Sequence, residues 1–239
     1  MKLGLIQCDY VPALLQTEFN DYPLMFERAF SEFDTDLDWT VIDICAGGHD
    51  VEVGDFDGFI ISGSRSSVND SKSWIIPLLN LIRRIIQKEV PLVGLCFGHQ
   101  AIAKALGGQV FKSKTGWNIG CVPVDLTAAG KSFLNVAQQP FLYAFHQDNV
   151  AVLPDDARLL GSTNVCKNFI VEFKKGVIGF QGHPEFDVAY MQGLLDINIA
   201  NLDDKDLFCV EKTLKKASHS IAVRRFIVNY IKKINQEIN

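Results

Sequence analysis

The sequence predicts an α/β fold, in which helices cover both faces of a doubly wound, mostly parallel sheet. Two patterns point to it. Short, nearly continuous apolar runs alternate with segments whose apolar residues recur at the spacing of a helix. The residues that stand out as candidates for chemistry each come directly after an apolar run. Ligands of such sheets bind beyond the carboxyl ends of the strands, so both patterns favour one architecture.

The first part of the chain supplies the parallel strands and the helices that cover them. Trp74–Lys88 is the clearest helix, because its apolar residues return every three or four positions. A tight turn at 94–98 then leads from an apolar strand into another helix. We expect strands at Lys2–Gln7, Trp39–Ile44, Gly58–Ser62 and Leu92–Leu95, and helices at Tyr22–Phe33, Trp74–Lys88 and Ala101–Leu106.

The middle of the chain has a different pattern. Its apolar runs are short and separated by turns, which is typical of antiparallel strands, so a small antiparallel extension of the sheet is predicted. The expected strands are Gln109–Phe111, Gly120–Asp125, Ala151–Leu153, Arg158–Ser162, Phe169–Phe173 and Val177–Phe180.

The C-terminal third is expected to be helical, at Val188–Asn201, Asp203–Ala217 and Ser218–Asn235. The last helix carries an apolar stripe between basic residues. A helix of this kind can lie on a membrane surface, but its terminal position and lack of tryptophan favour packing on the sheet. No repeat or linker divides the chain. We therefore predict one domain over residues 1–239, with the helices of about 188–236 packing on the sheet.

The composition excludes several classes of protein. The chain has 239 residues, 48% of them apolar and 21% charged, as in an ordinary globular protein. Its net charge of −5 and the lack of a basic run argue against a nucleic-acid partner. No apolar stretch is long enough to span a membrane, and the N-terminal segment reads as a strand rather than a signal peptide. Six cysteines without Cys-x-x-Cys spacing favour a reducing cytoplasm over a disulfide or zinc framework.

The segment Gly94-Leu95-Cys96-Phe97-Gly98-His99-Gln100 carries the strongest signal for chemistry. It places a cysteine on a sharp turn between a strand and a helix, which is the geometry of a nucleophile elbow. Glycines on either side of Cys96 suit a turn too tight for a Cβ atom. The positive end of the following helix favours a thiolate at this position. A buried cysteine taken alone is more often an inert core residue.

A candidate base lies near the end of a later strand. His183 and Glu185 are two residues apart, so their side chains point the same way if the backbone is extended. His183 can then accept the proton of Cys96, while Glu185 holds the imidazole in the required tautomer. His-Pro-Glu can also be an ordinary turn. The cysteine turn and this pair together favour an acyl-transfer enzyme.

These motifs resemble those of the class I glutamine amidotransferases, whose glutaminase domain uses a catalytic triad. The resemblance is closest to the free-standing subgroup related to the amidotransferase domain of GMP synthetase and to the γ-glutamyl peptidases. It implies a flavodoxin-like sheet. It rests on Gly-x-Cys-x-Gly-x-Gln and Gly-His-Pro-Glu, supported by Asp57–Ser64, Gly116–Gly120 and His146–Val150.

The resemblance also implies a role for each matching residue. Cys96 would form a γ-glutamyl thioester with glutamine, and His183 and Glu185 would complete the triad. The oxyanion hole would use the backbone N–H of Phe97 and that of Gly63 or Ser64. The resemblance further places Gln100, His146 and Gln147 at the substrate. No metal and no cofactor are implied, and His49 with Asp50 is too small a cluster for a metal site.

One position departs from the family pattern. Many members have Gly-Gly-Pro where this chain has Gly63-Ser64-Arg65. Gly63 keeps an N–H donor available, but Arg65 brings a cation to the mouth of the pocket. It would either meet a carboxylate of a larger γ-glutamyl substrate or lie in solvent. His99 is similarly open, since it either tunes the neighbouring thiol or simply faces the surface of its helix.

The expected function is hydrolysis of a γ-glutamyl amide. No synthetase domain is visible, so the ammonia would pass to a separate synthetase or acceptor subunit, unless the enzyme acts alone. The alternatives are a γ-glutamyl peptidase, which cleaves γ-glutamyl peptides or conjugates, and a catalytically silent, ligand-sensing member of the fold. The sequence leaves a homo-oligomer open.

Overall fold

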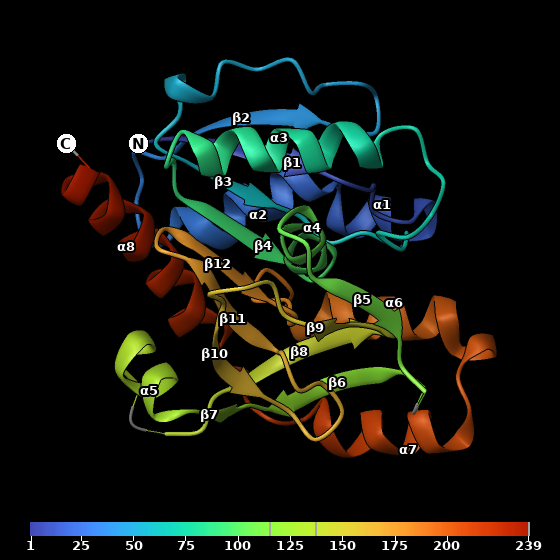
Figure 1. Cartoon of the computed structure of the whole chain (residues 1–239). Coiled ribbons are helices and arrows are strands. Elements are labelled where there is room, and N and C mark those ends of the chain that lie inside the picture. The colour runs from blue at the N-terminus through green and yellow to red at the C-terminus, as the bar shows by residue number, and fades with distance from the viewer. Residues whose placement is uncertain (115, 137, 239) are drawn as a thin grey trace.

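A computed structural model describes residues 1–114, 116–136 and 138–238, and in these residues the chain is built around an eight-stranded sheet. Five neighbouring strands are parallel: β2 (Asp38–Asp43), β1 (Lys2–Gln7), β3 (Gly58–Ile61), β4 (Leu92–Leu95) and β12 (Val177–Phe180). Three antiparallel strands extend the sheet past β12: β11 (Ile170–Lys174), β10 (Arg158–Ser162) and β7 (Asp125–Leu126). The predicted architecture, mostly parallel with an antiparallel extension, is confirmed (Figure 1).

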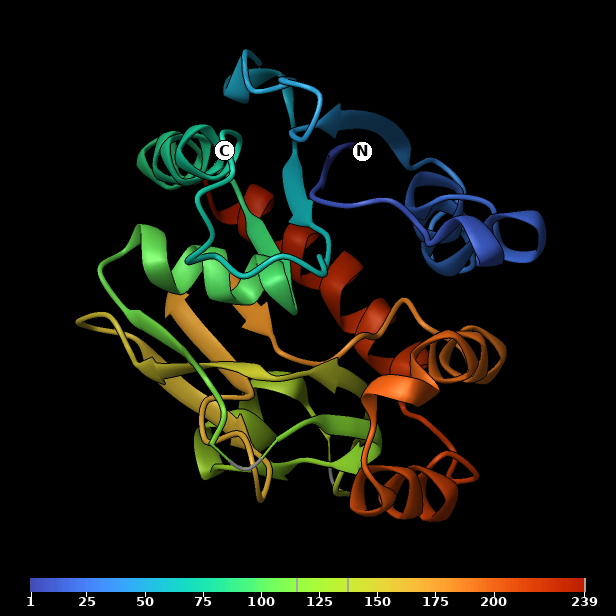
Figure 2. The ribbon, with the colours of Figure 1, turned by 90° about the vertical axis from the view of Figure 1, so that its right-hand side faces the viewer.

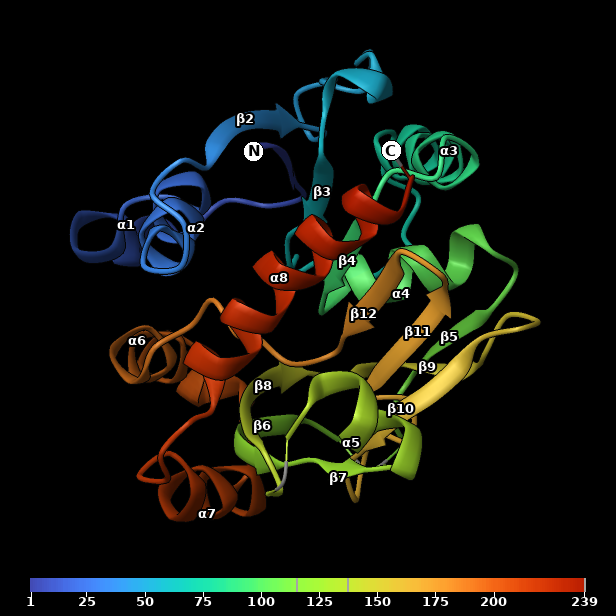
Figure 3. The same ribbon diagram turned by 90° about the vertical axis from the view of Figure 1, so that its left-hand side faces the viewer.

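Helices lie on both faces of the parallel strands, which Figures 2 and 3 show from two opposite sides. One face is covered by α3 (Ile75–Gln87) and α4 (Phe97–Ala105). The other is covered by α2 (Tyr22–Ser31) and α8 (Ser220–Ile238). Successive strand residues enter different cores: Leu5 packs on the α2 and α8 side, whereas Ile6 packs on the α3 and α4 side. The nearly continuous apolar strands in the sequence follow from this double burial.

Two small antiparallel sheets flank the extension. One pairs β5 (Gln109–Lys112) with β9 (Asp148–Val152), and the other pairs β6 (Asn118–Pro123) with β8 (Phe141–His146). The second sheet meets the segment that follows β12, where Tyr143 of β8 forms an isolated bridge with His183. The sequence predicted neither β8 nor the two short helices α1 (Ala13–Phe19) and α5 (Ala128–Leu134).

The C-terminal third is helical, as predicted, with α6 (Val188–Asn198), the 3₁₀ turn η2 (Ile199–Asn201), α7 (Asp204–Thr213) and α8. A further 3₁₀ turn, η1, spans Val53–Asp55. In α8, Val223, Ile227 and Ile231 are buried against the sheet side of the core. Among the described residues, no helix is long and apolar enough to cross a membrane. That the chain forms a single domain stays a prediction.

Close backbone approach explains the glycines around the turn at Cys96. A Cβ atom added to Gly94 would lie 2.5 Å from the carbonyl carbon of Gly98 and 2.6 Å from its oxygen. Gly98 in turn allows α4 to approach β3, because its own added Cβ would lie 2.6 Å from the carbonyl oxygen of Ile61. The helix therefore packs on the sheet at a distance that only glycine permits.

We expect Gly94→Ala to lower the free energy of unfolding by about 1–3 kcal/mol, because the methyl group meets backbone that cannot rotate away. Urea denaturation followed by circular dichroism measures this change. Gly54→Ala is the matched control, since its added Cβ would meet only Oε1 of Glu52, at 3.7 Å. Equal unfolding free energies for the two variants would contradict this account of the turn.

Candidate active site

The ends of three parallel strands bring the predicted residues together. β4 ends at Leu95, which pairs with Phe180, the last residue of β12. Cys96 therefore leaves the sheet beside Gln181 and close to His183. β3 lies on the other side of β4 and leads into Gly63. Cys96, His183 and Gly63 thus meet at the carboxyl edge of the sheet, where the strand pattern placed them.

Cys96 occupies a strained turn. Its backbone has φ 49° and ψ −100°, a conformation that a residue with a Cβ adopts at a cost. The turn is held because the N–H of Cys96 donates to the carbonyl of Phe180 at 2.8 Å. Its side chain is almost fully buried. The nucleophile-elbow geometry expected from the sequence is therefore present.

His183 and Glu185 form a buried pair. The distance between Nδ1 of His183 and Oε1 of Glu185 is 2.7 Å, and both residues are 4% exposed. Phe186 stacks on the imidazole, with ring centroids 4.0 Å apart and planes within 5°. The backbone N–H of His183 donates to the carbonyl of Tyr143 at 2.8 Å. The ring is therefore fixed by its hydrogen bonds and by stacking.

The imidazole lies next to the cysteine. A methyl group on Gly63 would be 2.9 Å from Cε1 of His183 and 3.8 Å from Cβ of Cys96, so both surround the same point. Burial alone disfavours a charged imidazole, but the Glu185 carboxylate and the contact with Cys96 raise the pKa of His183 to about 10. With Nδ1 bonded to Glu185, Nε2 is the nitrogen left for exchange of a proton at Cys96.

Backbone N–H groups suited to an oxyanion surround the same point. Phe97 begins α4, so its N–H has no partner within the helix. In the described part of the chain, the N–H groups of Phe97, Gly63 and Ser64 donate no hydrogen bond. These are the three donors named from the sequence. Such groups stabilise negative charge that develops on a substrate carbonyl.

A cavity of about 690 Å³ opens from this edge. Gly63, His183 and Gln100 line it, and the predicted residues His146 and Gln147 also border it. Apolar side chains line it as well, among them Phe111, Trp117, Phe145, Leu194 and Ile197. Trp117 and Phe145 meet edge to face, with centroids 5.3 Å apart.

Comparison with known proteins identifies the family. A model of the glutamine amidotransferase class-I family matches residues 25–193. The chain belongs to this family. It is 28% identical to γ-glutamyl peptidase 2 of Arabidopsis thaliana over 226 residues, which cover 92% of the chain and 88% of that protein. It is 36% identical to one of the subunits of the glutamine-hydrolysing GMP synthase of Methanobrevibacter smithii over 100 residues, covering 41% and 51% of the two chains.

The fold of a solved glutamine amidotransferase agrees. A glutamine amidotransferase from Thermotoga maritima superposes with a TM-score of 0.77, at 21% identity, over 97% of this chain and 98% of that one. The flavodoxin-like fold is therefore confirmed. In several of the matched relatives, the aligned part spans only 51% to 62% of the relative's own length. The activity of the whole relative therefore does not extend to this chain.

In this member of the family, Gln181 is a site residue that the sequence did not predict. Its Nε2 donates to Sγ of Cys96 at 3.5 Å, and its Oε1 accepts from Nε2 of Gln100 at 3.1 Å. Gln100 also donates to the carbonyl of Asp148 at 2.9 Å. Gln181 is fully buried. The available signal was a polar residue placed directly after the apolar strand Val177–Phe180.

His146 lies at the end of a strand that the sequence did not predict. It is the last residue of β8 and is buried, and burial lowers its pKa to about 3. Asn118 donates to its Nε2 at 3.0 Å, which leaves the proton on Nδ1 to donate to the carbonyl of Asp148 at 3.1 Å. A neutral His146 therefore holds the backbone beside Gln147 and Asp148.

His99 does not face solvent. It is fully buried, and burial lowers its pKa to about 3. Its Nε2 lies 2.9 Å from the carbonyl oxygen of Asn168 and donates to it. The ring thus ties α4 to the antiparallel part of the sheet.

Among the residues described here, no group of three or more His, Cys, Asp or Glu side chains is arranged to hold a metal ion.

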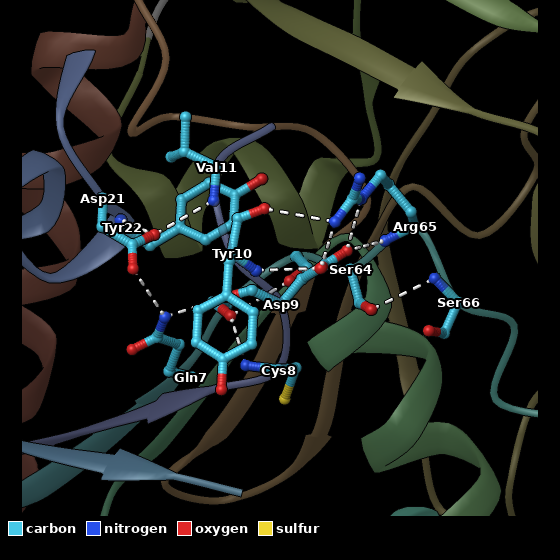
Figure 4. Close-up of polar contacts among 12 residues, drawn as sticks. Gln7, Cys8, Asp9, Tyr10, Val11, Asp21, Tyr22, Ser64, Arg65 and Ser66 are labelled. Carbon is cyan, nitrogen blue, oxygen red and sulfur yellow. Dashed lines mark hydrogen bonds and ion pairs between the residues drawn. The ribbon is translucent and has the colours of Figure 1, made fainter. Parts of the chain in front are cut away.

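Arg65 is not a free surface cation. Its guanidinium binds the carboxylate of Asp9 in a fork, with Nη2 2.7 Å from Oδ1 and Nε 2.9 Å from Oδ2 (Figure 4). Arg65 borders the mouth of the cavity. The ion pair therefore joins the loop after β1 to the loop after β3.

Replacing Glu185 by Gln removes a charge at nearly constant size. We expect the pKa of His183 to fall below its value of about 10, because the carboxylate stabilises the buried imidazolium. NMR titration of the imidazole measures it, with Glu172→Gln as the control. The raised pKa of His183 also contributes to the stability of the folded wild type. This contribution is fully present below pH 6.5 and is lost as the pH rises through about 10. An unchanged titration of His183 in Glu185→Gln would rule out this origin of the shift.

Proposed function

We propose that the chain is a cysteine hydrolase that cleaves the γ-carboxamide of glutamine and releases glutamate and ammonia. The observation that carries this proposal is the convergence of Cys96 with the buried His183–Glu185 pair at the ends of adjacent strands. Membership of the class I glutamine amidotransferase family supports the same chemistry.

In the first step, the sulfur of Cys96 attacks the γ-carbonyl carbon of glutamine while the proton of Cys96 is held on Nε2 of His183, whose raised pKa favours the imidazolium. Negative charge develops on the carbonyl oxygen. The N–H of Phe97, with that of Gly63 or Ser64, would bind this oxygen, and one such donor is typically worth about 3–4 kcal/mol in the transition state. Glu185 stabilises the imidazolium while the charge is present.

The tetrahedral intermediate then collapses. The C–N bond breaks as the imidazolium donates its proton to the departing nitrogen. Ammonia is released, and a γ-glutamyl thioester remains on Cys96. Water replaces ammonia in the second half. His183 takes a proton from the water as its oxygen attacks the thioester, and the C–S bond breaks to give glutamate. The imidazolium keeps this proton beside the freed sulfur, so the starting state of the enzyme is restored.

The substrate would lie in the cavity beside His183. Gln100 and Gln147 border the cavity with polar groups suited to the amino-acid end of glutamine. His146 would act by holding Asp148 and Gln147 in place. Gln181, bonded to the sulfur of Cys96 and to Gln100, would link the nucleophile to the substrate pocket.

The similarity to one chain of a GMP synthase supports transfer of the ammonia to a separate synthetase subunit. That relative's name implies a protein assembled from more than one chain. A cytoplasmic location and a homo-oligomer stay predictions.

A γ-glutamyl peptidase is the second candidate, and the cavity favours it. A volume of about 690 Å³ is in the range that holds drug-sized ligands, which are larger than glutamine. The apolar side chains among its lining residues suit a leaving group with a bulky apolar side chain. The alignment with γ-glutamyl peptidase 2 over 92% of the chain points the same way. The silent, ligand-sensing alternative is less well supported, because no member of the triad is missing.

We expect Cys96→Ser to lower glutamate release from glutamine by roughly four orders of magnitude or more, because the nucleophile is lost. An assay of glutamate measures it, and a glutamine-mimicking diazo-ketone should label Cys96 in the wild type. Cys45→Ser is the control, since Cys45 is a free and partly exposed cysteine outside the site. If Cys96 is unreactive and its replacement changes nothing, the silent alternative replaces both enzyme proposals.

Trp117→Ala tests the peptidase alternative. We expect it to raise the KM for γ-glutamyl-phenylalanine by about 3- to 10-fold, as for loss of an aromatic contact, while the KM for glutamine stays within twofold. Steady-state kinetics with both substrates measures the split. The control is Phe208→Ala, which alters an exposed aromatic residue on α7. No hydrolysis of any γ-glutamyl dipeptide by the wild type would exclude the peptidase and leave the glutaminase.

A further inference from the structure

Two loops meet at the carboxyl edge of the sheet, and one carboxylate joins them. The loop after β3 carries Gly63 and Ser64, the proposed oxyanion donors, and the loop after β1 carries Asp9. Three donors of Arg65 reach this carboxylate: the backbone N–H at 2.8 Å, Nε at 2.9 Å and Nη2 at 2.7 Å (Figure 4). A bidentate pair with an added backbone bond fixes both the side chain and the peptide of Arg65.

Asp9 is the fixed member of this pair. Its side chain is 12% exposed, whereas that of Arg65 is 66% exposed. Oδ1 of Asp9 also accepts from the N–H of Tyr10 at 2.8 Å, and its carbonyl accepts from Nε2 of Gln7 at 3.0 Å. Asp21 in turn accepts from Nε2 of Gln7 and from the N–H of Val11. The arginine and its loop are therefore held against an anchored carboxylate.

A second link joins the same loops on the other side of Ser64. The hydroxyl of Ser62 accepts from the N–H of Cys8 at 2.9 Å and donates to the carbonyl of Gly63 at 3.0 Å. In a planar trans peptide, fixing this carbonyl also fixes the direction of the N–H of Ser64. The carbonyl before Ser64 and the N–H after it are thus both tied to residues 8 and 9.

The loop needs such links because its sequence does not make it rigid. Residues 62–67 read Ser-Gly-Ser-Arg-Ser-Ser, with a glycine and no proline, so the free loop has many backbone conformations. Oxyanion donors act only when they are already in place, and small displacements are costly.

We propose that Asp9 is a positioning residue, which through Arg65 holds the 62–65 loop with its N–H groups aimed at the oxyanion. The proposal rests on the cysteine hydrolase function proposed above, because the oxyanion forms only in that reaction. Asp9 need not touch the substrate. Its loss should therefore slow the chemical step and leave substrate binding nearly unchanged.

A direct role of Arg65 in binding a substrate carboxylate makes a different prediction. Arg65→Met removes the fork but keeps the backbone N–H that donates to Asp9, so under our proposal it should be milder than Asp9→Ala. If Arg65 instead binds the substrate, Arg65→Met should raise KM strongly and Asp9→Ala should do so less.

The experiment compares Asp9→Ala, Arg65→Met and the double variant. We expect Asp9→Ala to lower kcat for glutamine by about 10- to 100-fold with KM within about threefold, as for misplaced donors. Arg65→Met should lower kcat less, and the double variant no more than Asp9→Ala. Glutamate γ-semialdehyde binds by addition of the thiol to its aldehyde carbon, which turns the aldehyde oxygen into an oxyanion. Its binding should weaken in parallel with kcat. Alkylation of Cys96 by iodoacetamide should stay unchanged, since it needs no oxyanion.

Glu172→Ala is the matched control, because Arg158 and Glu172 form an ion pair with exposures of 52% and 17%, close to those of Arg65 and Asp9, on strands away from the site. Its kcat should equal that of the wild type. A kcat of Asp9→Ala within twofold of this control would overturn the proposal, as would a large rise in KM for Arg65→Met at unchanged kcat. If Asp9→Ala does not fold, Asp9→Asn takes its place. The asparagine side chain has the same size, but its amide N–H₂ group faces the donors of Arg65 and cannot accept from them. A wild type that hydrolyses no γ-glutamyl amide marks a failure of the proposed function instead.

Discussion

The parallel pairing of β4 with β12 is the constraint on which the site depends. Leu95 lies opposite Phe180, and the N–H of Cys96 continues the ladder by donating to the Phe180 carbonyl. That bond helps to offset the cost of a positive φ at a residue with a side chain. The same pairing places Gln181 at the sulfur of Cys96, and His183 follows Gln181 by two residues. The distance between nucleophile and base is thus set by strand register.

A second strand fixes the base from the opposite side. The N–H of His183 donates to the Tyr143 carbonyl in β8, so the segment after β12 is held between the main sheet and the small one. Glu185 is buried with its imidazole partner, and such a pair is tolerated in a protein interior only when its geometry is good. The antiparallel part of the molecule therefore serves to hold the histidine as well as to cover the core.

The features that the sequence predicted correctly are local. The glycines around Cys96 and the spacing of His183 and Glu185 each encode their geometry within a few residues. β8 was missed, and its end at His146 is polar rather than apolar. His99 was misjudged because α4 is buried at every residue but Lys104, so helical position does not tell which of its polar residues meets a partner. Its partner, the carbonyl of Asn168, is 69 positions away.

The contacts that give the site its shape join residues far apart in the chain. Arg65 binds Asp9 across 56 positions, Gln100 meets Gln181 across 81, and Gln181 reaches Cys96 across 85. Each joins segments that leave the sheet at one edge, where parallel strands bring distant residues together. Periodicity reveals which face of an element is buried but not which polar groups meet at such an edge. A one-residue shift of β1 would point Asp9 to the opposite face and leave Arg65 and the neighbouring donors without an anchor, so register governs the proposed oxyanion site as it governs the triad.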